Sequence, residues 1–225
     1  LSMLGLGGKQ ESVDDFMEKG AVIIDVRTVG EFQQGNIKGS KNIPLNTIST
    51  KIEEIKKLVQ DFQDAAKRAL EAGFDLIEIH AAHGYLVHQF LSPLSNVRTD
   101  EYGGSFENRI RFLVEIVEAV NELLDDNHPL FVRISGTEYA ENGWNIEESV
   151  QLAEILKNKN VDLIDVSSGG NIHGAKITLF DGYQVPLAAK IKSKTGMKTG
   201  AVGLIKSAKQ AEEILQNNQA DLIFV

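Results

Sequence analysis

Short runs of apolar, mostly β-branched residues alternate along the chain with longer segments of helical period. This alternation is typical of βα units that build a parallel sheet. The runs predict strands at residues 21–26, 42–45, 75–80, 130–135, 163–167, 199–202 and 222–225, with a weaker, glycine-rich candidate at 3–6. The segments of helical period predict helices at residues 12–18, 47–71, 108–124, 146–158, 186–194 and 207–217.

One apolar stripe continues through the predicted helix 47–71, where apolar residues recur three or four positions apart. They are Ile48, Ile52, Ile55, Val59, Phe62, Ala66 and Ala69. We therefore predict a single α/β domain over residues 1–225. With seven or eight strands it would be barrel-like, of the TIM-barrel type, while an open doubly wound sheet satisfies the same pattern and remains the alternative.

Two helix ends carry recognisable signals. Asn145 followed by Glu148 three residues later predicts a capping box at the start of helix 146–158. Gly73 marks the expected end of helix 47–71.

Composition narrows the range of functions. The formal charge of −9 would repel nucleic acid and anionic membranes, so we expect neither as a partner. No apolar run approaches the roughly 20 residues of a membrane span, and the first residues lack the basic start of a signal peptide, so we expect a cytoplasmic protein. The absence of cysteine excludes disulfides, thiolate metal sites and cysteine nucleophiles. If the sheet is incomplete, an oligomer is possible.

Residues 1–50 contain IIDVR at 23–27, EF at 31–32, GNI at 35–37, GS at 39–40 and NIP at 42–44. With these motifs the segment resembles the front half of a rhodanese sulfurtransferase domain. That family transfers sulfur through a cysteine persulfide. Because the chain contains no cysteine, sulfur transfer by that route is chemically excluded.

Residues 51–225 carry a series of distinctive motifs, which are EIHAAHGYL at 78–86, FLSP at 90–93, RTDEYGGS at 98–105, FVRIS at 131–135, DVSSG at 165–169 and GAVGLI at 200–205. These motifs are similar to those of the old yellow enzyme family, in particular of bacterial NADPH dehydrogenases that bind FMN and reduce activated alkenes. The resemblance implies βα units four to eight of a barrel, FMN as cofactor and NADPH as reductant. Together, the two resemblances suggest a chimera.

The resemblance also implies site residues. His80 and His83 would hydrogen-bond the substrate carbonyl oxygen, and Tyr85 would supply a proton. The alternative is that both histidines are only packing or loop residues. We expect no metal site, although His88 lies near both histidines in the sequence, because no acidic residue is spaced as a familiar partner.

Further residues would bind FMN. Arg133 would lie beside the pyrimidine edge of the flavin, or would instead form a salt bridge to a residue such as Glu78. The phosphate would lie against Ser168, Gly169, Gly200 and Gly203. The first three barrel units of the family have no counterpart here, so we expect a small-molecule or phosphate ligand with weak or no ene-reductase activity. The alternative is an active FMN-dependent NADPH:enone oxidoreductase.

Overall fold

The computed structural model describes residues 24–25, 33, 35, 40–42 and 52–225. The chain divides into two compact units, Leu1–Glu54 and Ile55–Val225. In the first unit, β1 (Ile24–Asp25) pairs in parallel with β2 (Lys41–Asn42). The elements predicted at 3–6 and 12–18 lie outside the described residues. A single domain over residues 1–225 stays a prediction.

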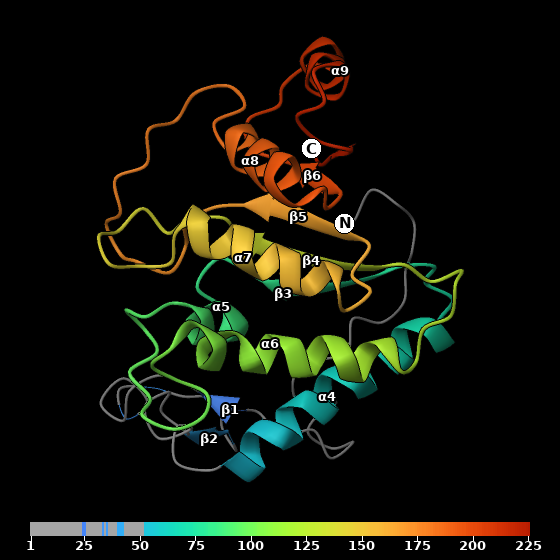
Figure 1. Cartoon of the computed structure of the whole chain (residues 1–225). Coiled ribbons are helices and arrows are strands. Elements are labelled where there is room, and N and C mark those ends of the chain that lie inside the picture. Colours follow the sequence, from blue (N-terminus) through green and yellow to red (C-terminus); the bar gives the residue numbers. More distant parts are fainter. Residues whose placement is uncertain (1–23, 26–32, 34, 36–39, 43–51) are drawn as a thin grey trace. The chain divides into compact units, whose positions relative to one another are not determined.

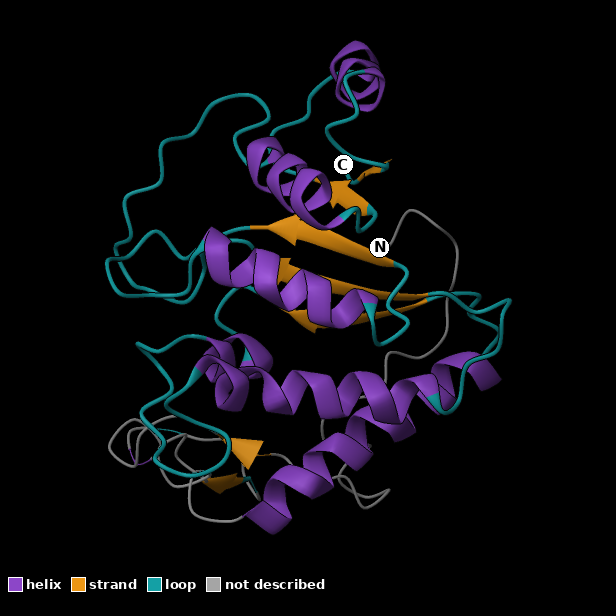
Figure 2. Ribbon diagram, viewed as in Figure 1, coloured by secondary structure: helices purple, strands orange, loops and turns teal. Residues whose placement is uncertain are grey.

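From residue 52 onward, helices and strands alternate as the sequence pattern predicts (Figures 1 and 2). The elements are α4 (Ile52–Glu71), β3 (Ile77–Ala81), α5 (Leu86–Leu91), α6 (Phe106–Asn121), β4 (Leu130–Ser135), α7 (Ile146–Lys157), β5 (Leu163–Ser167), α8 (Val185–Thr195), β6 (Thr199–Ala201), α9 (Ala208–Gln216) and β7 (Leu222–Ile223). Only α5 was not predicted. Among the described residues, no helix is long and apolar enough to cross a membrane.

The strands β3 to β7 form one parallel sheet in the order β3-β4-β5-β6-β7. Each strand lies beside the next strand along the chain. A doubly wound sheet reverses its order at a switch point, whereas a barrel does not. The prediction of parallel βα units is confirmed, and the order of the described strands is that of a barrel segment.

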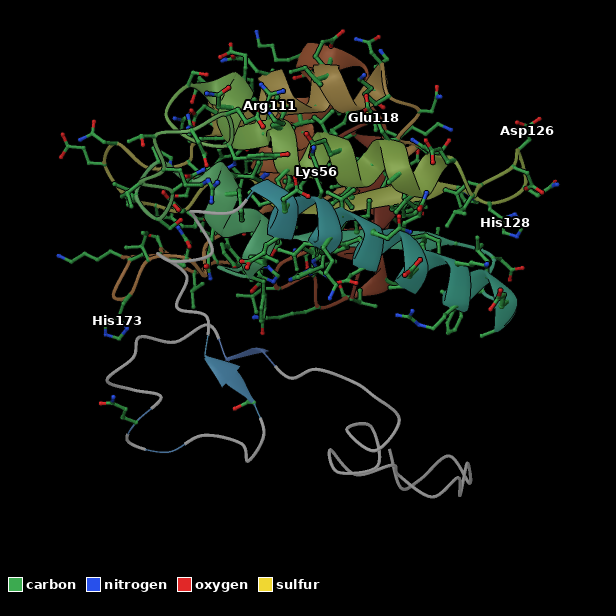
Figure 3. All side chains as sticks on the ribbon, turned by 90° about the horizontal axis from the view of Figure 1, so that it is seen from below. Lys56, Arg111, Glu118, Asp126, His128 and His173 are labelled. Carbon is green, nitrogen blue, oxygen red and sulfur yellow. The ribbon has the colours of Figure 1, made fainter. Side chains whose placement is uncertain are left out.

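The helices α6, α7 and α8 lie on one face of this sheet (Figure 1). This follows from the strand order, because crossovers that all advance in one direction and are all right-handed place their helices on the same side. Lys56 on α4, and Arg111 and Glu118 on α6, project from helix surfaces (Figure 3). Helices α6, α7 and α8 do not cover the opposite face of the sheet.

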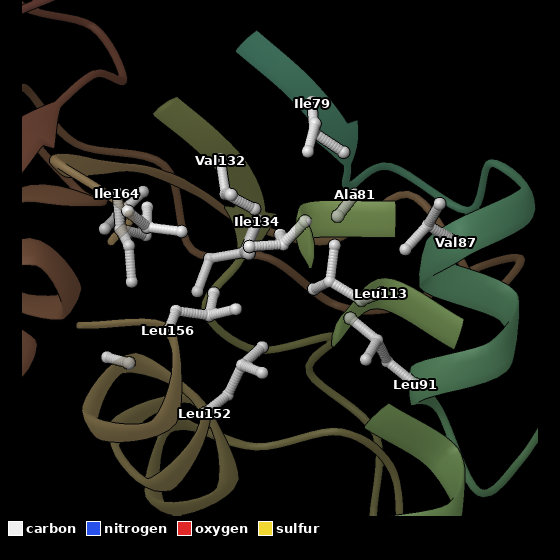
Figure 4. Packing of buried hydrophobic residues seen from close by; sticks show 14 of the residues in the cluster. Ile79, Ala81, Val87, Leu91, Leu113, Val132, Ile134, Leu152, Leu156 and Ile164 are labelled. Atoms are coloured by element: carbon white, nitrogen blue, oxygen red, sulfur yellow. The ribbon is translucent and has the colours of Figure 1, made fainter. Parts of the chain in front are cut away.

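The core lies between the sheet and its helices (Figure 4). In β3, Ile77, Ile79 and Ala81 are buried while Glu78 and His80 are exposed, as period-two alternation requires. The buried side chains of the strands pack with those of the helices, including Ile79, Val132, Ile134, Ile164, Leu113, Leu152 and Leu156. The sheet therefore has one apolar face and one polar face.

Candidate functional site

A row of functional side chains crosses the polar face of the sheet. The strand register aligns His80 of β3 with Arg133 of β4, Arg133 with Asp165 of β5, and Asp165 with Gly200 of β6. Residues paired in this way project from the same face of a sheet. His80 is exposed, whereas Asp165 is completely buried.

Three aromatic rings gather at the carboxyl end of β3. The ring centroids of His80 and His83 lie 5.3 Å apart, and those of His80 and Tyr85 also lie 5.3 Å apart. The side chain of Tyr85 is exposed, and His83 is half-buried. The structure thus brings together the three residues for which the sequence predicted catalytic roles, at the edge where parallel α/β folds form their sites.

His83 and Gly84 form an unusual turn between β3 and α5. Both have left-handed backbone conformations, with φ of 59° at His83 and 76° at Gly84. A non-glycine residue in this region costs about 1–3 kcal/mol and persists only where its surroundings hold it. Gly84 allows no side chain, because a Cβ there would lie 2.4 Å from the carbonyl oxygen of Gly170.

Two serines hold His83. Its backbone N–H donates to Ser135 Oγ at 3.0 Å, and its Nε2 lies 2.6 Å from Ser167 Oγ. Ser135 ends β4 and Ser167 ends β5. Three neighbouring strand ends therefore fix the position of this imidazole.

Both histidines at the site are neutral near pH 7. Partial desolvation by the surrounding side chains lowers the pKa of His80, although its side chain still reaches solvent, and the charge of Arg133 lowers it further. Burial, Arg133 and His80 lower the pKa of His83 in the same way. A neutral imidazole still carries one N–H, so each ring can donate a hydrogen bond to a carbonyl oxygen.

Arg133 forms its ion pair with Asp165, with 3.2 Å between Nε and Oδ2. The sequence had offered a salt bridge to a residue such as Glu78 as the alternative role of Arg133. An ion pair is present, but its partner is Asp165, because the register aligns Glu78 with Phe131 and sets Arg133 beside Asp165. Burial raises the pKa of Asp165 to about 7, although the charge of Arg133 opposes the shift. Burial also raises the pKa of Glu78.

The residues proposed for the phosphate lie in different settings. Ser168 Oγ accepts a hydrogen bond from Gln184 Nε2 at 2.6 Å, and a Cβ on Gly203 would lie 2.4 Å from Gln184 Oε1. The backbone N–H of Gly169 donates to the carbonyl oxygen of Thr137, in the loop after β4, at 2.8 Å. Gly200 lies inside β6, where a Cβ would meet the ring of Phe224. Their roles toward a phosphate stay predictions.

Sequence reasoning missed four polar residues of this region. Ser135, Asp165 and Ser167 had a readable signal, because strand alternation places them on the same face as Arg133. Gln184 comes from the loop before α8 and had no such signal. Across the residues that the structure describes, no group of three or more histidine or acidic side chains is placed to hold a metal ion.

Comparison with known proteins gives related sequences. The profile of the NADH:flavin oxidoreductase / NADH oxidase family matches residues 7–225. An NADPH dehydrogenase of Bacillus pumilus is 55% identical over 196 residues, which are 85% of this chain and 57% of the relative. An NADPH dehydrogenase of Geobacillus thermodenitrificans is 49% identical over 226 residues, 97% of this chain and 66% of the relative. The chain thus spans about half to two thirds of these relatives.

Solved structures share the fold. A 2-naphthoyl-CoA reductase aligns with a TM-score of 0.70 and 27% identity, covering 84% of this chain and 29% of that protein. Morphinone reductase aligns with a TM-score of 0.62 and 28% identity, covering 84% and 48%. The profile match also includes most of residues 1–50 and gives no support for a separate rhodanese-like fragment. The fragment and the chimera therefore stay predictions. The chain belongs to the NADH:flavin oxidoreductase / NADH oxidase family.

Proposed function

We propose that this chain binds FMN and uses NADPH to reduce alkenes that are activated by a carbonyl group. The observation that carries the proposal is the cluster of His80, His83 and Tyr85, whose rings meet beside Arg133 at the carboxyl end of β3. The proposed partner is therefore a small molecule.

The residues present fit a flavin. Arg133 is partly exposed on the polar face of the sheet, with its Nε held beside Asp165, so the exposed part of its guanidinium is available to a ligand. A guanidinium there would favour negative charge on the pyrimidine edge of the ring. Ser168 and Gly203 would lie toward the phosphate. When bound, reduced FMN supplies a hydride to the alkene β-carbon, and NADPH renews it.

The protein's own residues would handle the oxygen and the proton. His80 would donate its N–H to the substrate carbonyl oxygen. His83 would donate from Nδ1, with its Nε2 accepting from the Ser167 hydroxyl, and the two bonds would stabilise the enolate that develops there. Neutral imidazoles suit this task, since their pKa values are lowered by desolvation and by Arg133. The exposed phenol of Tyr85 would then donate its proton to the α-carbon, which completes the reduction.

The test uses the purified chain with added FMN and 2-cyclohexen-1-one. We expect visible flavin absorbance that stays with the protein and enone-dependent oxidation of NADPH. Tyr85→Phe removes only the proton donor and should lower kcat by roughly 10²-fold or more, with FMN binding unchanged.

The matched control is Tyr102→Phe. Tyr102 is buried away from the site and bonds to Glu115 Oε2 at 2.9 Å, so this variant should retain the rate of the unchanged protein. Failure to take up FMN, or equal rates for Tyr85→Phe and the unchanged protein, would overturn the proposal.

A further inference from the structure

The left-handed turn at His83 and Gly84 has a support that the proposed chemistry does not use. The backbone N–H of Gly84 donates to Nδ1 of His88 at 3.0 Å. His88 lies on α5, one helical turn further along the chain, and its side chain is completely buried. Because Gly84 lies between His83 and Tyr85, this hydrogen bond acts on the backbone that carries both side chains.

The hydrogen bond fixes the protonation of His88. An imidazole nitrogen that accepts a hydrogen bond carries no proton, so the single proton of neutral His88 is on Nε2. Burial lowers the pKa of His88 to about 4, with smaller contributions from the charges of His83 and His80. The ring is therefore neutral near pH 7, with Nδ1 free to accept.

The far side of the His88 ring faces a buried carboxylate. Nε2 lies 3.7 Å from Glu138 Oε2 and has no hydrogen-bond partner. Glu138 is fully buried and is held by Ser92 Oγ at 2.8 Å, by the Trp144 N–H at 2.7 Å and by Asn171 Nδ2 at 2.7 Å. The carboxylate thus favours the tautomer with the proton on Nε2.

This network connects the segments that follow three neighbouring strands, two loops and helix α5. Glu138 follows β4, Asn171 follows β5, and His88 follows β3. The loop after β5 also packs directly on the turn, because the carbonyl oxygen of Gly170 fills the space beside Gly84. An apolar side chain in place of His88 would fill the volume but would leave the part-buried Gly84 N–H without its acceptor.

We propose that His88 is a positioning residue whose Nδ1 holds the Gly84 N–H and thereby sets the imidazole of His83 and the phenol of Tyr85 relative to each other. The inference rests on the proposed function for the roles of His83 and Tyr85. The hydrogen bond from the Gly84 N–H to His88 Nδ1 is a property of the chain alone, so it can be measured in the protein without FMN.

The test compares variants that differ at the Nδ1 position. His88→Asn places an amide oxygen near Nδ1, whereas His88→Leu removes the acceptor and keeps a side chain of similar size. His88→Gln extends its amide toward Nε2 and serves in place of the leucine variant if that variant does not fold. Amide hydrogen exchange of Gly84, followed by NMR in the protein without FMN, reports the hydrogen bond directly.

We expect His88→Leu and His88→Gln to lower the protection of the Gly84 amide by roughly tenfold or more, with His88→Asn retaining it. In the FMN-loaded protein, kcat should fall by roughly tenfold or more in the first two variants and recover in His88→Asn, with KM changing less. Equal protection of Gly84 in all variants, or rates that follow only thermal stability, would overturn the inference. Absence of FMN uptake would defeat the proposed function but would leave the exchange result decisive for the turn.

Discussion

Asp165 is a carboxyl group on the polar face of the sheet that is completely buried, with neither oxygen hydrogen-bonded. Its one close partner is Arg133, which is partly exposed to solvent. Burial of a carboxylate opposes ionisation, and here this effect exceeds the attraction of Arg133, so the pKa of Asp165 is raised to about 7. The group therefore binds its proton more tightly in the folded chain than in the unfolded chain.

Asp165→Asn should change how stability depends on pH. The pKa of an unfolded Asp is about 3.9, so the contribution of Asp165 is fully present below about pH 4 and is lost as the pH rises toward about 7. Relative to Asp165→Asn, the unchanged protein should lose about 2–4 kcal/mol of unfolding free energy over that interval. Urea denaturation at pH 5 and pH 8 measures this.

Asp181→Asn is the control for that comparison, because Asp181 is an exposed aspartate paired with Lys206 and should leave the pH profile unchanged. Parallel profiles for Asp165→Asn and the unchanged protein would show that Asp165 ionises normally in the folded state.

At the level of elements, long periodic segments could be predicted from the sequence, and short ones set by tertiary contacts could not. Strands β4 and β5 begin and end where alternation and β-branched residues predict. Helix α5 has only six residues, too few to show a helical period. The turn before it was also not predicted, because a left-handed His83 depends on contacts from other strands.

The start of α7 shows a local signal that was only partly correct. Asn145 caps the helix as predicted, accepting from the Glu147 and Glu148 N–H groups at 3.0 and 3.1 Å. The side chain of Glu148, however, does not close a capping box on the Asn145 backbone N–H. One of its oxygens binds the guanidinium of Arg109 on α6, and the other accepts from Asn145 Nδ2 at 3.4 Å. A charged partner from another helix is stronger than the reciprocal bond to a backbone N–H.

Asn145→Ala should therefore lower the unfolding free energy by about 1 kcal/mol, the usual value for loss of an N-cap. Thermal or urea unfolding measures the change. Asn158→Ala provides the control at the other end of the same helix, where an exposed side chain bonds to the Glu154 carbonyl at 2.9 Å. A loss of equal size in both variants would mean that the cap contributes no more than a surface contact.

On the scale of the whole molecule, the strand order explains why one face of the sheet carries the chemistry. Successive neighbours in the order β3 to β7 place the helices on one side, so apolar side chains fill that side. The polar row of His80, Arg133 and Asp165 follows from alternation on the other side. This row includes the cationic side chain of Arg133, whereas the chain as a whole carries a formal charge of −9.

The positive charge of Arg133 attracts an anionic ligand, whereas the net charge of −9 repels it. Measurements at different ionic strengths distinguish the two effects. The Debye length falls from about 30 Å at 0.01 M salt to about 8 Å at 0.15 M, so added salt screens the distant acidic residues before it screens contacts at the site. Because the net charge of −9 repels the FMN phosphate, the association rate constant of FMN should rise severalfold over this range. Stopped-flow quenching of flavin fluorescence measures it, and riboflavin, which lacks the phosphate, should show no such rise. A rate constant for FMN that falls with salt would mean that the positive field around Arg133 outweighs the net charge during the approach.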